Sequence, residues 1–166
     1  MLPLVFTLLL GIIWFGRAFN IYSTIQQAAQ QGAITAARNS CATTCGNATA
    51  PNGTVTSCPQ TGPAGSVAYV IATVMCASSV DPTQIIANSP SAVSCVNPPN
   101  PATCTNASNI TVCSQVLLNS PTSATQLPQC GVVVGFQYPY QFYLPFTSIN
   151  MTQITLSAQA QSRMEN

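Results

Sequence analysis

The first nineteen residues constrain the fold most, because they are too apolar for a small domain to bury by itself. From Leu2 to Phe15 almost every residue is apolar, and the first charged residue is Arg17. A helix that is apolar on all sides lies in lipid or in a bundle of similar helices. Residues 1–16 would cover about 24 Å as a helix. Extension past Arg17 to Phe19 would allow a membrane span of ~30 Å if the arginine side chain reaches back to the interface.

The sequence predicts that this helix continues to about Arg38, with a total length of about 55 Å, and becomes amphipathic. Small residues on its apolar face would let another backbone approach closely. The apolar face consists of Ala18, Tyr22, Ile25, Ala29, Gly32 and Ala36, and the opposite face carries Asn20, Gln26, Gln27, Gln30 and Gln31. The stretch from Ala29 to Ala36 would pack either on the chain's own sheet or on the helix of a neighbouring copy.

We predict an assembly surface along this helix, through which copies of the chain would contact one another. It consists of Leu4, Leu8, Ile12, Phe15, Phe19, Tyr22, Ile25, Ala29, Gly32 and Ala36. A cleavable signal peptide is the alternative interpretation of the first segment. It fits poorly, because the apolar run has no basic region before it and no small-x-small cleavage site between it and Arg17.

Eight cysteines follow the apolar segment, and their even number predicts a disulfide framework formed in an oxidising compartment. They are Cys41, Cys45, Cys58, Cys76, Cys95, Cys104, Cys113 and Cys130. A metal site is the alternative, but the gaps are irregular, no CxxC pair occurs and the chain has no histidine. The pairing stays open at this stage, with Cys41 and Cys45 placed to tie the end of the helix to the rest of the chain.

Beyond the helix the pattern predicts a small α+β head, so that residues 1–38 form an assembly helix and residues 39–166 a disulfide-bonded globular part. Ser66 is typical of an N-cap before a short amphipathic helix, and Asp81-Pro82 favours one more helical turn. Cys, Gly, Pro, Asn and Thr predict loops at 39–63 and 88–107. Alternating residues predict strands at 110–116, from 132 onward and at 154–160. Two or three antiparallel strands would pack on the second half of the long helix.

Half of the aromatic residues lie close together near the C-terminal end. They are Phe136, Tyr138, Tyr140, Phe142, Tyr143 and Phe146. We expect them to form the core of the sheet against Tyr22 and Ile25. The alternative is an exposed patch that binds sugars or a surface.

The low charge of the chain argues against several classes of function. Lys and Arg total 3, Asp and Glu total 2, and the net charge is +1, so no electric field would attract nucleic acid. Asp81 and Glu165 are the only carboxylate side chains, and no phosphate-binding loop or nucleophile elbow occurs. We therefore expect no enzymatic activity, no cofactor and no metal.

Five Asn-x-Ser/Thr triplets fit a chain that is displayed at a surface, and would mark possible glycosylation sites. Their asparagines are Asn47, Asn52, Asn106, Asn109 and Asn150. The alternative is chance, because a chain rich in Asn and Thr produces such triplets freely.

Two stretches of the chain resemble one family. The opening LPLVFTLLLGIIWFGRAFNIYSTIQQAAQQGAITAAR is similar to the start of TadE-like pseudopilins, with an apolar run, an aromatic-Gly-Arg-Ala-Phe element and an Ala-rich helix. The last strand, with Arg163 and Glu165 in an Arg-x-Glu ending, and the segment Tyr138-Pro139-Tyr140 resemble the family's C-terminal part. The resemblance covers roughly the first 38 and the last 35 residues, and the middle from 39 to 130 shows no such signature.

The resemblance implies a type IV pilin-like subunit of a tight-adherence (Tad) system. Such subunits are made with a short basic leader, are held in the inner membrane by the apolar helix and are cut by a prepilin peptidase. Assembly machinery then packs them helix to helix into a surface fibre. The family pattern places a cleavage site and a Glu-Phe pair shortly before the Leu-Pro, whereas the printed sequence starts at Met1, directly before Leu2 and Pro3.

Three hypotheses follow for the function. The first is a structural subunit that polymerises through its N-terminal helix into an extracellular filament for adhesion. The second is a membrane-anchored minor pseudopilin or surface adhesin that does not form the bulk of a fibre. The third is a secreted redox or carbohydrate-binding module, for which the first 38 residues would be dispensable.

Overall fold

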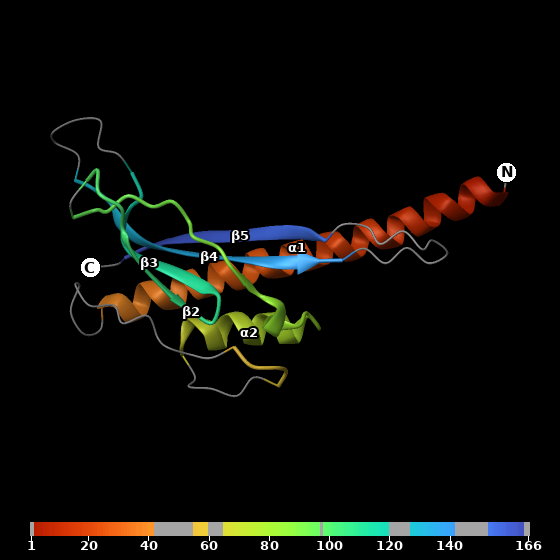
Figure 1. The fold of residues 1–166 in the computed structure, drawn as a ribbon, viewed down its shortest axis with the longest axis horizontal. Coiled ribbons are helices and arrows are strands. Elements are labelled where there is room, and N and C mark those ends of the chain that lie inside the picture. The colour runs from red at the N-terminus through yellow and green to blue at the C-terminus, as the bar shows by residue number, and fades with distance from the viewer. Residues whose placement is uncertain are drawn as a thin grey trace.

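Helix α1, Leu2–Cys41, is 40 residues long and dominates the shape of the molecule (Figure 1). At 1.5 Å per residue it spans about 60 Å. In this computed structural model the described residues are 2–41, 55–59, 65–96, 98–119, 127–141 and 153–164. The helix therefore continues three residues past the predicted end at Arg38. Its N-terminal part projects beyond the rest of the chain, and its C-terminal part lies against the head (Figure 1).

A five-stranded antiparallel sheet covers one side of the C-terminal half of α1. The strands are β1 (Ile86–Ala87), β2 (Thr103–Ala107), β3 (Ile110–Leu117), β4 (Cys130–Tyr140) and β5 (Ile154–Arg163). Strand β4 is central: β5 pairs along one edge, β3 and the short β1 pair along the other, and β2 pairs with β3. Because side chains alternate along a strand, Val134 and Phe136 and their partners Ala160 and Ala158 all join the core cluster that includes α1.

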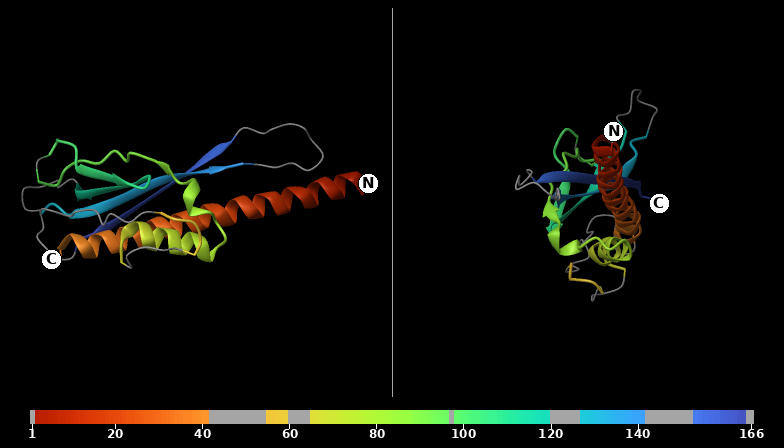
Figure 2. Two further views of the ribbon diagram at one scale, coloured as in Figure 1. Left: turned by 60° about the horizontal axis from the view of Figure 1, so that its bottom comes forward. Right: turned by 90° about the vertical axis from the view of Figure 1, so that its right-hand side faces the viewer.

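Helix α2, Val67–Ala77, packs on α1, so the head is layered as sheet, α1 and α2 (Figure 2). Ser66 caps it as predicted, because its Oγ accepts a hydrogen bond of 3.1 Å from the Tyr69 backbone N–H. Gly32 allows the close approach of the two helices, since a Cβ at this position would lie 2.8 Å from Cδ1 of Ile71. The predicted turn after Asp81 is the 3₁₀ helix η1, Pro82–Gln84.

The α+β prediction is confirmed, and the number of strands was predicted too low. The expected loop at 88–107 contains β2, as well as isolated bridges from Val93 to Pro101 and from Ser94 to Val116. Strand β2 has no apolar alternation of its own. It forms because the left-handed turn residues Ser108 and Asn109, with φ of 52° and 64°, return the chain along β3 in a tight hairpin.

Three disulfides connect the described parts of the head, which confirms the predicted framework. They join Cys58 to Cys76, Cys95 to Cys130 and Cys104 to Cys113. The first attaches the segment at 55–59 to the end of α2, the second attaches the loop before β2 to the start of β4, and the third bridges the β2–β3 hairpin. The side chain of Cys41 and all of Cys45 lie outside the described residues, so the predicted link at the end of α1 stays a prediction.

Candidate membrane and assembly surface

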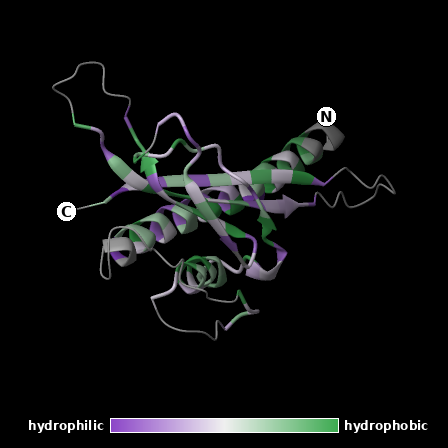
Figure 3. Ribbon diagram, turned by 60° about the vertical axis from the view of Figure 1, so that its left-hand side comes forward, coloured by the Kyte–Doolittle hydropathy of each residue, from purple (hydrophilic) through white to green (hydrophobic). Residues whose placement is uncertain are grey.

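The N-terminal half of α1 exposes large apolar side chains on nearly all sides. Figure 3 shows the ribbon of the whole chain coloured by hydropathy. Phe15 is 76% exposed and Phe19 is 73% exposed, whereas a core residue would be covered. The other exposed large side chains of this half are Val5, Phe6, Leu8, Leu9, Ile12, Ile13 and Tyr22. The head covers almost none of this surface, which we call the exposed apolar half. Its size far exceeds what single scattered apolar residues would give.

The C-terminal half of the same helix is buried in the head. Ile25, Ala28 and Ala29 are fully buried, and Gly32, Ala33, Ala36 and Ala37 are also buried. The predicted glutamine face is exposed at Gln27, Gln30 and Gln31. Gln26 is half-buried, and its Nε2 donates a hydrogen bond of 3.1 Å to the carbonyl of Ser157 on β5.

The ten predicted assembly residues therefore separate into two groups. Leu8, Ile12, Phe15, Phe19 and Tyr22 are exposed and are spaced by 4, 3, 4 and 3 positions. This spacing is the 3.5-residue repeat of helices that pack side by side. Ile25, Ala29, Gly32 and Ala36 continue the repeat but are buried within the chain, so their side chains are not available to a neighbouring copy. The side chain of Leu4 lies outside the described residues.

Helix α1 is also long and apolar enough to cross a membrane, by length and composition. It is the single such helix in the described part of the chain. The head covers little of the most apolar part of this helix. The core helix of a compact domain would instead be mostly buried.

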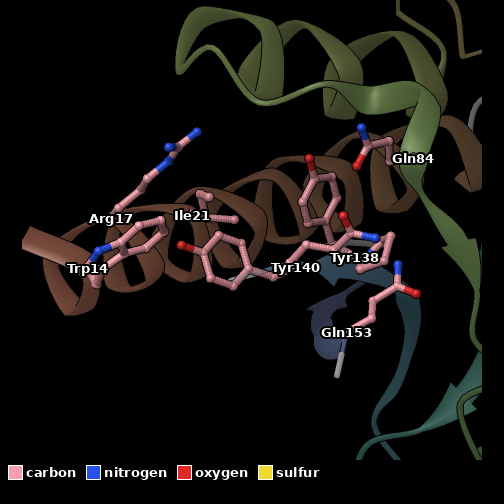
Figure 4. A pocket seen from close by; sticks show the side chains of 9 residues that line it. Trp14, Arg17, Ile21, Gln84, Tyr138, Tyr140 and Gln153 are labelled. Atoms are coloured by element: carbon pink, nitrogen blue, oxygen red, sulfur yellow. The ribbon is translucent and has the colours of Figure 1, made fainter. Parts of the chain in front are cut away.

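A cleft of about 520 Å³ lies where α1 leaves the head. Its residues come from α1, from η1 and from the end of the sheet formed by β4 and β5. They are Trp14, Arg17, Ile21, Gln84, Tyr138, Pro139, Tyr140, Gln141 and Gln153. Figure 4 shows the ring of Tyr140 beside Trp14 and Ile21, Tyr138 further along the strand, and Arg17 next to Trp14. We call this the junction cleft.

The pKa of Tyr138 is raised in this cleft. Burial of the phenol raises its pKa above the ordinary value, and the negative charge of the nearby Asp81 raises it further. The Asp81 carboxylate itself accepts hydrogen bonds from the backbone N–H and the hydroxyl of Thr83, at 3.0 and 2.8 Å. It is thus engaged by its own turn rather than by the cleft.

The aromatic segment forms part of the core, as expected, with one of its two predicted partners. Phe136, Tyr138 and Tyr140 are buried, and Ile25 is buried in the same cluster as the first two. Tyr22 is 44% exposed, so its predicted core role is wrong. Phe142, Tyr143 and Phe146 lie outside the described residues.

Two of the five predicted glycosylation sites fall in the described chain. Asn106 and Asn109 are both exposed on the β2–β3 hairpin. The side-chain amide of Asn109 donates to the carbonyl of Ile85 at 2.8 Å, and that of Asn106 donates to the hydroxyl of Thr111 at 3.3 Å. These hydrogen bonds explain the two asparagines as structural residues of the hairpin. Asn47, Asn52 and Asn150 lie outside the described residues.

Sequence reasoning did not single out the junction cleft. Trp14, Arg17 and Ile21 are spaced by three and four positions, so they would have been placed on one helix face. No local signal, however, connects them to Gln84 or Gln153, which reach the cleft only through the packing of η1 and β5.

Comparison with protein families bears on the exposed apolar half directly. The TadE-like protein family model matches residues 1–33. The N-terminal segment is TadE-like. The match covers the exposed apolar half and the start of the buried half of α1, and it ends before the head. The resemblance noted in the last 35 residues lies beyond it. No curated protein and no solved structure matches the chain.

Proposed function

We propose that the protein is a structural, pilin-like subunit that polymerises through the exposed apolar half of α1 into an extracellular filament for surface attachment. The observation that carries this proposal is the contrast within α1, whose sequence is TadE-like while one half is buried and the other is uncovered. A fully buried large apolar side chain contributes about 1.5–3 kcal/mol. The exposed apolar half has nine large apolar side chains in contact with solvent. Their burial in lipid or against neighbouring helices would therefore be strongly favourable.

The exposed apolar half would contact membrane lipid first and neighbouring helices of the filament afterwards. The subunit is held in the inner membrane by α1 before assembly, and Tad-type machinery then extracts it. In the filament, equivalent helices of neighbouring copies replace the lipid around residues such as Ile12 and Phe15. Because each copy presents the same rod, this head-to-tail packing is open and gives a helical polymer.

The alternative is a membrane-anchored minor pseudopilin or adhesin that never forms the bulk of a fibre. The head, with three disulfides among its described residues, suits either role. Copy number and fractionation separate the two: the alternative predicts few copies, all of them recovered with the inner membrane.

The decisive experiment compares two substitutions at equally exposed apolar positions. Ile12 on α1 and Val96 in the head are both 61% exposed. Ile12→Asp places a charge in the proposed contact and would abolish fibres in sheared surface material seen by electron microscopy. Val96→Asp should leave the fibres intact. Fibres of normal number and length from the Ile12→Asp strain would contradict polymerisation through this surface.

A second substitution separates assembly from membrane anchoring. Phe19 is 73% exposed but follows Arg17, so a charge at this position lies at the end of the apolar segment. We expect Phe19→Asp to reduce fibre formation at least tenfold while the protein still fractionates with the inner membrane. Gln27→Asp, further along the exposed polar face, is the control. Normal fibre yield from Phe19→Asp would favour the membrane-anchored alternative.

A further inference from the structure

We infer that the junction cleft binds the phosphate group of an anionic phospholipid headgroup while α1 is in the membrane. The inference rests on the proposed membrane-anchored state and adds a ligand class and a set of residues to it. It is argued from the lining of the cleft, from the placement of charge around it and from its position along α1.

The lining has the donors that a phosphate diester requires. Arg17 supplies a guanidinium, whose planar set of N–H groups matches phosphate oxygens. The side-chain amides of Gln84 and Gln153 and the phenol of Tyr138 add neutral hydrogen-bonding groups at the other end of the cleft (Figure 4). No carboxylate is among the described residues that line the cleft.

The charge distribution favours an anion at this site. Arg17 is exposed and is the only charged residue in the first 37 positions of the chain. Asp81 is the nearest described carboxylate to Tyr138, and both hydrogen bonds recorded for its Oδ1 come from Thr83. The Asp81 carboxylate thus lies in the η1 turn outside the lining and acts on Tyr138 at one end of the cleft, while the positive charge of Arg17 lies at the open rim.

The position along α1 identifies a lipid as the source of the phosphate. On the N-terminal side of Trp14, α1 exposes Val5, Phe6, Leu8, Leu9, Ile12 and Ile13. From Leu2 to Trp14 the helix rises about 18 Å, which lies in hydrocarbon when the cleft is at the interface. Trp and Tyr are enriched at membrane interfaces, and the cleft combines Trp14 with Tyr138 and Tyr140 beside an arginine. A soluble phosphate compound has no acyl chains to place against these exposed apolar side chains.

Trp14 is the only tryptophan of the chain, so its fluorescence reports on the cleft. Full-length protein in nonionic detergent micelles would be titrated with dihexanoyl phosphatidylglycerol, with dihexanoyl phosphatidylcholine and with glycerol 1-phosphate. We expect a saturable change in Trp14 emission with phosphatidylglycerol, and much weaker binding of the other two. Glycerol 1-phosphate binding as tightly as phosphatidylglycerol would overturn the lipid assignment, and so would the absence of a saturable signal.

Two variants test the role of Arg17 itself. Arg17→Gln should weaken phosphatidylglycerol binding about fivefold, as expected for one arginine at an anionic interface. Arg38→Gln removes the other arginine of α1, which is exposed at the far end of the helix, and should leave binding unchanged. Equal affinities of wild type and Arg17→Gln would overturn the proposal, as would equal losses in both variants, which would indicate a general charge effect.

Depth-dependent quenching provides a readout that is independent of affinity. In nanodiscs, Trp14 should be quenched more strongly by lipids brominated near the headgroup than by lipids brominated deep in the chains. Stronger quenching by the deep label would overturn the placement of the cleft at the interface. Failure of polymerisation would leave these measurements unaffected, whereas a protein that does not enter nanodiscs at all would contradict the proposed function first.

Discussion

The two halves of α1 use one repeat of apolar residues for two different purposes. From Leu8 to Tyr22 the stripe is uncovered, and from Ile25 to Ala36 the same spacing continues under the chain's own head. The difference lies in side-chain size. Leu, Ile and Phe predominate in the first half, whereas Ala and Gly predominate after Ile25, where α2 and the sheet approach closely. Residue size thus separates the part of the helix that folds from the part that we propose assembles.

Truncating one isoleucine in each half gives the largest expected difference. Ile25 is fully buried, so Ile25→Ala should lower the free energy of unfolding of the head by about 2–5 kcal/mol. Ile12→Ala removes the same atoms from an exposed position and should change it by no more than about 0.5 kcal/mol. Denaturant unfolding of the full chain in detergent measures both. Similar losses for the two variants would mean that the two halves do not differ as described.

The glycines of α1 sharpen the comparison, because the same substitution should have opposite signs. A Cβ at Gly32 would lie 2.8 Å from Cδ1 and 2.9 Å from Cγ1 of the buried Ile71. Overpacking costs about 1–3 kcal/mol, which exceeds the gain of about 0.5–1 kcal/mol from replacing glycine in a helix.

Gly32→Ala should therefore destabilise the head by roughly 1 kcal/mol. Gly16 meets nothing within 4 Å, so Gly16→Ala should leave the stability unchanged or increase it. The same unfolding measurement applies to both variants. Stabilisation by Gly32→Ala would show that α2 can shift away from α1 at little cost.

Much of this fold could be predicted, because its helices and its last strand follow from sequence patterns over a few neighbouring residues. The helix signal of α1 and α2, the cap at Ser66 and the alternation of β5 all depend on neighbours within a few positions. Strands β1 and β2 could not be predicted, because Ile86–Ala87 is only two residues long and β2 is held by its pairing with β3. The register that brings Cys104 opposite Cys113 likewise depends on the hairpin turn rather than on cysteine spacing.

The candidate site also has one part that local sequence predicts and one part that depends on contacts between distant residues. The exposed apolar half could be predicted, since a helix that is apolar on all sides has no place in a small head. The exposure of Tyr22 could not, because the periodicity that predicts a buried stripe does not say where along the helix the head begins. The junction cleft forms at that boundary, from residues of α1, η1 and the ends of β4 and β5 that lie far apart in the sequence.

Substitution of Tyr138 has the smallest expected effect on the free energy of unfolding. It tests the boundary between the two halves of α1, because Tyr138 lies where the buried half meets the exposed half. Burial and the charge of Asp81 favour the neutral phenol in the folded chain, so its pKa is raised relative to the unfolded chain. The stabilising contribution is complete below about pH 10, the ordinary tyrosine value, and is lost as the pH rises through the folded pKa. Tyr138→Phe removes this titration. The free energy of unfolding should therefore fall more steeply for wild type than for Tyr138→Phe as the pH rises past about 10. Parallel pH profiles would show that solvent reaches the phenol, and hence that the head does not close around α1 at this level.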